Sequence, residues 1–103
     1  MKNIYLNIIL FVCLFTGFAN AQDNKQSIDG LALYPNPTTT GKIYITSKSG
    51  ENKDISIFDV LGKLVLQTAL ATKELSVSVL APGVYIIKIR ENEATSTRKL
   101  IVR

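Results

Sequence analysis

The chain has 103 residues, one cysteine, no histidine and no tryptophan, and its 12 lysines and arginines against 8 aspartates and glutamates give a formal net charge of +4. A chain of this length forms at most one small domain. Without histidine it cannot use Ser-His-Asp or Cys-His catalysis, nor bind a metal through imidazole.

The first 21 residues, MKNIYLNIILFVCLFTGFANA, differ from the rest of the chain. Lys2 gives a positive start, an apolar stretch follows, and the small residues Ala19 and Ala21 flank Asn20. This order is typical of a secretory signal peptide, cut here between Ala21 and Gln22. A transmembrane anchor is the alternative, but a span needs about 20 apolar residues, and polar residues and a glycine interrupt this stretch.

The sequence then predicts a polar linker and one domain. Residues 22–30, QDNKQSIDG, are polar and aperiodic, as linkers and frayed termini are. The domain covers residues 31–103 and contains no cysteine, because Cys13 lies in the leader, so its stability must come from its core. The positive excess lies in the last twenty residues, where five lysines and arginines outnumber two glutamates. A basic end can attract anionic partners, although solvated charges on outward strand faces explain the individual residues more simply.

Short β-like runs separated by turn signals fill the domain at regular spacing, which is typical of a sandwich or barrel. Alternation is clearest in residues 84–90, where Tyr85, Ile87 and Ile89 share one face. No helical period of useful length follows the leader. Strands are expected over residues 31–34, 42–47, 53–60, 63–70, 75–79, 84–90 and 94–103. The predicted fold is therefore all-β, a small antiparallel seven-stranded immunoglobulin-like β-sandwich.

Two turns are predicted from their residue types. Asp59 and Gly62 bracket a tight hairpin, because aspartate favours the first turn position and glycine provides a positive φ. Pro82 and Gly83 suit the two central positions of a type II turn.

Two strands carry features beyond simple alternation. In residues 53–60, Ile55 and Ile57 share a face while Phe58 and Val60 lie on the other, so either both faces are covered or a bulge shifts the phase. In the last strand, the alternation predicts Leu100 and Val102 inward and Lys99, Ile101 and Arg103 outward. An exposed edge with the apolar Ile101 is a candidate site for docking or strand addition.

The search for catalytic or ligand-binding motifs is negative. The glycines explain turns rather than a phosphate loop, and the acids show no calcium-loop spacing. A paired-carboxylate hydrolase stays an alternative, although small sandwiches seldom enclose a cleft. Tyr34, Tyr44, Phe58 and Tyr85 are more simply core residues than stacking platforms for bases. We therefore expect no enzyme activity, no cofactor, no metal, no nucleic acid and no small-molecule substrate.

Three stretches occur in a fixed order up to the last residue. They are Leu33-Tyr34-Pro35-Asn36-Pro37, then Ile57-Phe58-Asp59-Val60-Leu61-Gly62-Lys63, then Pro82-Gly83-Val84-Tyr85-Ile86-Ile87-Lys88 with the terminal Lys99-Leu100-Ile101-Val102-Arg103. Together they resemble the type A C-terminal sorting domain of the type IX secretion system of Bacteroidetes-type bacteria. The resemblance covers residues 31–103.

The resemblance implies a module that acts by being recognised. The Sec machinery and signal peptidase would deliver the chain to the periplasm, and the outer-membrane translocon would recognise the folded domain. A sortase-like peptidase at the cell surface would remove the domain, leaving its cargo secreted or linked to lipopolysaccharide. The positions that match the family motifs are Pro35, Asn36, Pro37, Asp59, Gly62, Pro82, Gly83, Tyr85, Lys99, Leu100, Ile101, Val102 and Arg103. Packing and turn formation alone explain most of these residues. Only the basic terminal strand is better explained as a recognition surface than as a packing requirement.

The resemblance leaves the cargo unexplained. A cargo would be expected between leader and sorting domain, where only residues 22–30 lie. The domain is then an orphan module, a truncated remnant or itself the secreted product. A second hypothesis, from a different class, is a small exported adhesion or structural β-sandwich that binds glycans or proteins at the cell surface.

Overall fold

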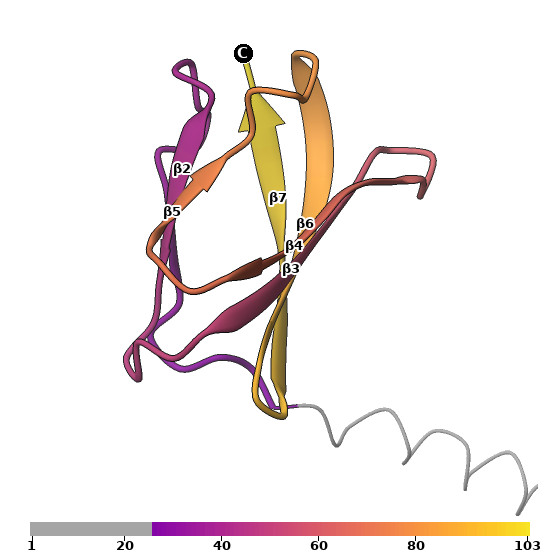
Figure 1. The fold of residues 1–103 in the computed structure, drawn as a ribbon. Coiled ribbons are helices and arrows are strands. Elements are labelled where there is room, and N and C mark those ends of the chain that lie inside the picture. Colours follow the sequence, from indigo (N-terminus) through magenta and orange to yellow (C-terminus); the bar gives the residue numbers. More distant parts are fainter. Residues whose placement is uncertain (1–25) are drawn as a thin grey trace, which may run out of the picture.

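The structure, a computed structural model, describes residues 26–103 (Figure 1). The predicted signal peptide and its cleavage site at Ala19, Ala21 and Gln22 lie outside the described residues. Seven strands are present: β1 (Ala32–Tyr34), β2 (Lys42–Thr46), β3 (Lys53–Phe58), β4 (Leu64–Leu70), β5 (Glu74–Ser76), β6 (Gly83–Glu91) and β7 (Ala94–Val102). Within residues 26–103 there is no helix with the length and apolar character needed to cross a membrane.

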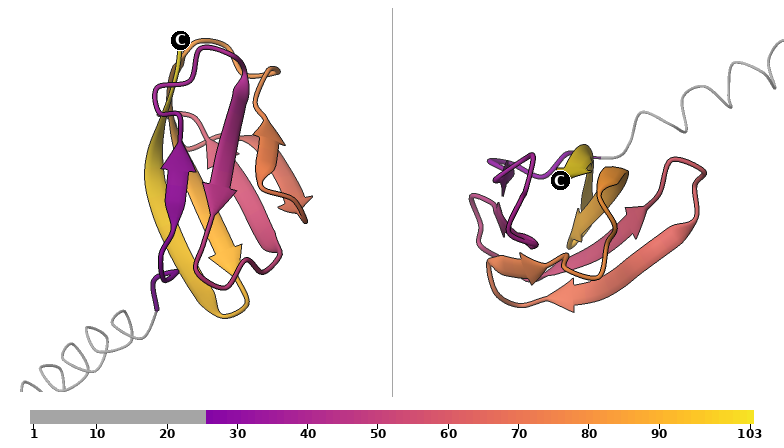
Figure 2. Two further views of the ribbon diagram at one scale, coloured as in Figure 1. Left: turned by 90° about the vertical axis from the view of Figure 1, so that its left-hand side faces the viewer. Right: turned by 90° about the horizontal axis from the view of Figure 1, so that it is seen from above.

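The strands form two sheets that pack against each other (Figure 2). One sheet has the order β1-β2-β5 and the other the order β4-β3-β6-β7, and every neighbouring pair of strands is antiparallel. This arrangement confirms the predicted all-β, seven-stranded antiparallel sandwich.

The core follows directly from the alternation in the sequence. Side chains at every second position of β2, β3 and β6 point between the sheets and are fully buried. They are Ile43, Ile45, Ile55, Ile57, Ile87 and Ile89, joined by Val77 and by Leu100 of β7. Each buried aliphatic side chain of this kind contributes roughly 1.5–3 kcal/mol, so β-branched residues at alternate positions account for most of the packing.

The aromatic residues do not all belong to this core. Tyr85 is buried and Phe58 is half-buried, but Tyr34 and Tyr44 are exposed. The last two are cross-strand partners on β1 and β2, and their rings stack with centroids 5.6 Å apart and an angle of 22° between their planes. Placing these two tyrosines in the core was therefore wrong, because they lie on the outer face of the three-stranded sheet. Phe58 is likewise outside the core, on the outer face of the four-stranded sheet.

A bulge lies where the sequence left two alternatives open. The pairing of β3 with β4 shifts between Ile57 and Phe58, so that Ile57 faces Leu66 but Phe58 faces Leu64. The extra residue, Val65, is thus in β4, and β3 keeps its own alternation. Phe58 consequently stays on the outer face of the sheet, beside Ile86 of β6.

One predicted turn is confirmed. Gly62 has a φ of 84°, and its nitrogen donates to the carbonyl oxygen of Asp59 at 3.0 Å. The carboxylate of Asp59 accepts two further bonds, from the nitrogens of Leu61 and Lys63, each at 2.9 Å. Asp59 and Gly62 therefore hold the β3–β4 hairpin in the way that their residue types predict.

The predicted type II turn at Pro82 and Gly83 is wrong. Gly83 is the first residue of β6 and pairs with Val102, so it adopts an extended conformation without a positive φ. The turn comes earlier, where the nitrogen of Leu80 donates to the oxygen of Val77 at 3.0 Å. Because this turn ends β5 at Ser76, the strand predicted to reach Val79 is too long, and the side chain of Val79 is 75% exposed rather than inward.

Candidate recognition surface

β7 is an edge strand of the four-stranded sheet, and residues 36–38 cover the open side of its C-terminal end. The amide of Asn36 bonds to two backbone groups of β7: Nδ2 donates to the oxygen of Lys99 at 2.7 Å, and Oδ1 accepts from the nitrogen of Ile101 at 2.9 Å. One side chain thus takes the place that a neighbouring strand would occupy.

Thr38 also bonds to the backbone of β7, beyond the two bonds from Asn36. Its nitrogen donates to the oxygen of Ile101 and its oxygen accepts from the nitrogen of Arg103, both at 2.9 Å. Thr38 is itself fully buried, and its hydroxyl donates to the oxygen of Lys42 at 2.8 Å. We call this arrangement of Asn36 and Thr38 on β7 the terminal clip. The peptide bonds that precede Pro35 and Pro37 are both cis.

The clip corrects one expectation about the last strand. Residues 99–103 were expected to offer an open edge for strand addition. Their outward backbone groups already bond to Asn36 and Thr38, so another strand has no room to pair there. The expected side-chain directions are confirmed: Leu100 and Val102 are buried, Lys99 and Arg103 are exposed, and Ile101 is half-buried.

The segment from Pro82 to Tyr85 lies beside the same end of β7. Gly83 pairs with Val102 and Tyr85 pairs with Leu100. The Tyr85 hydroxyl donates to the backbone oxygen of Ala81, which ties the ring to the loop before β6. The motif residues around Asn36, Gly83 and Lys99 therefore meet at one end of the sandwich.

The motif stretch around Asp59 does not join them. The hairpin from Asp59 to Gly62 begins after Phe58, which pairs with Ile86 rather than with the first residues of β6. Figure 1 shows the hairpin projecting to one side of the molecule, away from the C-terminus. Its tip is apolar and open to solvent, with Val60 73% and Leu61 89% exposed.

A mixed basic and apolar surface lies next to the clip, on the outer face of the four-stranded sheet. Cross-strand pairing sets Val84 beside Ile101 and Ile86 beside Lys99, and Arg103 follows at the end of the chain. We call these five residues the terminal surface. Neither Lys99 nor Arg103 forms an ion pair with any residue in 26–103, so both charges are available to a partner.

The opposite end of the sandwich holds a buried ion pair that the sequence analysis missed. Lys53 Nζ lies 3.2 Å from Glu91 Oε2, and the two side chains are 5% and 10% exposed. Ser47 and Ser49 donate to the Glu91 carboxylate, and Lys53 also donates to the oxygen of Glu51 at 2.7 Å. No single stretch of sequence signals this cluster, because its members come from a loop and from the ends of two strands.

The environment of Glu91 shifts its titration. Burial alone would raise the pKa of this carboxyl, but the hydrogen bonds from Ser47 and Ser49, together with the Lys53 ammonium, lower the pKa below its ordinary value. At the surface of the other sheet, the pKa of Lys42 is raised by its hydrogen bond and charge interaction with Glu74. Glu91 and Glu74 are thus each paired with a lysine.

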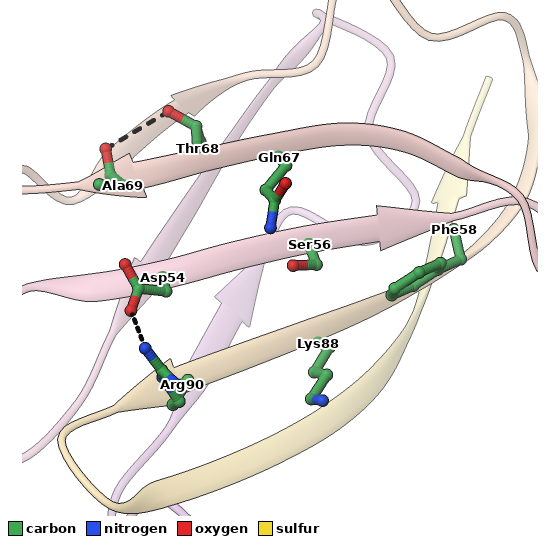
Figure 3. Close-up of a pocket in the computed structure, with 8 residues that line it drawn as sticks. All are labelled: Asp54, Ser56, Phe58, Gln67, Thr68, Ala69, Lys88 and Arg90. Carbon is green, nitrogen blue, oxygen red and sulfur yellow. Dashed lines mark hydrogen bonds and ion pairs between the residues drawn. The ribbon is translucent and has the colours of Figure 1, made fainter.

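The outer face of the four-stranded sheet also has a shallow hollow (Figure 3). Arg90 and Asp54 pair across one end of it at 2.9 Å, and both are exposed, so the ion pair contributes at most about 1 kcal/mol. Among residues 26–103 no buried side-chain nitrogen or oxygen lacks a hydrogen-bond partner, and no three His, Cys, Asp or Glu side chains gather as metal ligands would.

The described domain is thus a small β-sandwich whose matched motifs, except the stretch around Asp59, gather around a clipped, basic terminal strand. The comparison with known families is specific: the sequence model of the secretion system C-terminal sorting domain matches residues 32–103. The chain belongs to this family. Its domain is a sorting signal for type IX secretion, as the motifs predicted, and it is a targeting module. Membership implies interaction with the secretion system and export to the outer membrane or cell surface.

The comparison with solved structures finds the same fold elsewhere. One similar solved structure is that of PorZ, described as an essential bacterial surface component of the type-IX secretion system of Porphyromonas gingivalis. The TM-score is 0.55 and the identity is 23%, over 72% of this chain and 11% of the PorZ chain, so the likeness shows a shared fold. The chain thus corresponds to about a tenth of the length of PorZ. No curated protein matches it.

Proposed function

We propose that the outer-membrane translocon of the type IX system recognises the folded domain, residues 31–103, through the terminal surface. One observation carries the proposal: the terminal clip fixes the backbone of residues 99–103, so Lys99, Ile101 and Arg103 project from a rigid strand. A charged and apolar set held in this way is pre-organised, and binding it costs little conformational entropy.

The route to that encounter extends the proposal. The leader, residues 1–21, directs Sec export and is removed by signal peptidase after Ala21. Residues 22–30, expected as a linker, lead into the domain and pack on it at their end, where Ile28 is buried in the core. The domain then reaches the translocon from the periplasm, and a sortase-like peptidase acts after translocation. Of the motif positions, Pro35, Asn36, Pro37, Pro82, Gly83 and Tyr85 shape the surface. Under this proposal, Asp59 and Gly62 shape the β3–β4 hairpin, and Leu100 and Val102 anchor β7 in the core.

The test is a reporter carrying a Sec signal and residues 31–103, expressed in a bacterium that has the translocon. Surface display is expected for the unchanged domain, and a periplasmic fraction is expected for Lys99→Gln with Arg103→Gln. Lys48→Gln with Lys42→Gln removes the same charge from the other sheet and should leave export unchanged. Full export of the first variant, folded by circular dichroism, would contradict recognition through the terminal surface.

Deletion of residues 99–103 is a poor test. It removes the buried side chains of Leu100 and Val102 and breaks the bonds to Asn36 and Thr38. The deleted domain should unfold, and a loss of export would then say nothing about recognition. The second hypothesis, an adhesion or structural sandwich, has no better support from the described residues.

A further inference from the structure

The edges of the two sheets differ in how well they are protected. Exposed edges invite pairing with other chains, and proteins usually shorten, charge or cover them. Two of the four edges, β1 and β5, are only three residues long. The edge at β7 is covered at one end by the terminal clip and at the other by Gln26, whose oxygen accepts from the nitrogen of Thr95 at 2.9 Å.

The edge at β4 lacks each of these protections. It is seven residues long, LVLQTAL, without a charge or a proline. Within residues 26–103 no strand pairs with its outer side. A long, uncharged, open edge next to three protected ones is therefore the place where this fold can accept another strand.

Alternation across the sheet identifies the open backbone groups. In β7 the outward groups belong to odd-numbered residues, because Ile101 bonds outward to Asn36 and Thr38. Backbone groups of antiparallel strands alternate between their two neighbours. The registers carry this pattern through β6 and β3, so that Leu66, Thr68 and Leu70 bond to β3. Gln67 and Ala69 therefore point their N–H and C=O groups away from the sheet.

Two further features lie beside these groups. The hairpin that leads into β4 exposes Val60 and Leu61, and Leu64 at the start of the strand is 44% exposed. The charge of the segment has one sign: residues 60–73 contain Lys63 and Lys73 and no acid. Both lysines are exposed, and neither pairs with an acid among residues 26–103.

From these observations we infer that the β4 edge binds an extended, acidic segment of a partner protein by strand addition. Gln67 and Ala69 form the main-chain hydrogen bonds, Val60 and Leu61 are covered by apolar partner side chains, and the two lysines attract the acids. A second copy of this chain is the disfavoured occupant. Antiparallel self-pairing centred on Thr68, with Gln67 of each copy opposite Ala69 of the other, sets Lys63 opposite Lys73 of the other copy, and like charges that face each other across strands are destabilising.

The inference goes beyond the sorting role and does not depend on it. It is tested in solution on the protein as the cell processes it, recovered from the cell envelope and labelled with ¹⁵N. The probe is a nine-residue peptide of alternating threonine and valine with glutamate at both ends. A matched peptide carries lysine at both ends.

The glutamate peptide should slow amide hydrogen exchange at Gln67 and Ala69 and bind at least about tenfold more tightly than the lysine peptide, a difference of about 1.4 kcal/mol. Its affinity should fall as salt rises. Equal affinity for the two peptides, or protection at Thr97 on the β7 edge instead, would overturn the inference. So would protection of Gln67 that grows with protein concentration in the absence of peptide, since this would identify a second copy as the occupant.

Two sets of variants sharpen the result. Gln67→Pro removes an outward N–H without breaking the ladder to β3, and it should abolish peptide protection at Ala69. Thr97→Pro makes the same change on the β7 edge and should leave binding intact. A variant with Lys63→Glu and Lys73→Glu, which leaves the backbone unchanged, should prefer the lysine peptide. Retention of the original preference in that variant would refute the charge argument even if the proline variants fail to fold.

Discussion

The side-chain oxygen of Asn36 accepts a hydrogen bond from the backbone nitrogen of Ile101 at 2.9 Å, across 65 positions of sequence. This contact joins the loop after β1, in one sheet, to the last strand of the other sheet. The loop around Asn36 thus acts on the conformation of residues 99–103 and has a structural role in presenting them.

Asn36→Ala should therefore loosen the terminal strand. The change removes two hydrogen bonds, each with a net contribution of about 0.5–1.5 kcal/mol, so we expect the free energy of unfolding to fall by about 1–3 kcal/mol. Hydrogen exchange at the Ile101 amide should accelerate more than at Ile87 in the middle of β6. Asn52→Ala, in an exposed loop, is the matched control. Unchanged exchange at Ile101 would show that the clip does not hold the strand.

Leu100 and Ile101 are neighbours with opposite roles. Leu100→Ala empties a fully buried site and should destabilise the domain by about 2–5 kcal/mol. Ile101→Ala removes a half-buried outer side chain, so it should change stability much less while reducing export of a reporter. Urea denaturation and surface display of the same two variants measure both effects. A stable Leu100→Ala domain, or normal export with Ile101→Ala, contradicts this division.

The two motif glycines, Gly62 in a turn and Gly83 in a strand, provide a matched pair of substitutions. Gly62 has a positive φ and no atom within 4 Å of an added Cβ, so Gly62→Ala costs only backbone strain. We expect a loss of about 1 kcal/mol or more. Gly83 has an extended conformation, and an added Cβ would meet the Tyr85 ring at 3.8 Å, an ordinary contact. Gly83→Ala should thus be close to neutral in thermal denaturation, and a larger loss there than at Gly62 would contradict the assigned backbone conformations.

Acid should weaken the fold through Glu91. The pKa of this carboxyl is lowered in the folded protein, so the unfolded state binds the proton more readily. The stabilisation is fully present above the unfolded value of about 4.3. It is lost as the pH falls through the lower folded value. Urea midpoints measured from pH 7 to pH 3 should stay level at first and then fall.

The two serines supply the control for this pH dependence. Ser47→Ala with Ser49→Ala removes bonds that lower the pKa of Glu91 while keeping Lys53. The acid-induced fall in stability should then be smaller, and end at a higher pH, than in the unchanged protein, because the folded pKa lies closer to the unfolded one. Identical acid profiles would mean that these hydrogen bonds do not set the titration of Glu91.

The sequence predicts this fold well because its core uses a simple rule. Ile43 and Ile45, or Ile87 and Ile89, alternate with polar neighbours, and that pattern alone indicates the strands and their inner faces. The errors occur where longer-range contacts decide the geometry. Gly83 next to a proline is typical of a turn, but pairing with Val102 draws it into β6.

The site was less accessible to sequence analysis than the fold. The motif around Asn36 singled out this loop, but it did not indicate that its side chains and backbone would close the edge of β7. Lys53 and Glu91 are ordinary charged residues in the sequence, and only the register of β3 against β6 brings them together. Such contacts depend on the folded topology, so local patterns carry no sign of them.

Under the proposed recognition through the terminal surface, the terminal clip also links binding to folding. Residues 99–103 take their fixed shape only when Asn36 and Thr38, from the beginning of the domain, have reached them. A truncated or misfolded domain therefore lacks this shape even if its basic residues are intact. Any component that binds the clipped strand performs a quality check on the whole domain in the same step.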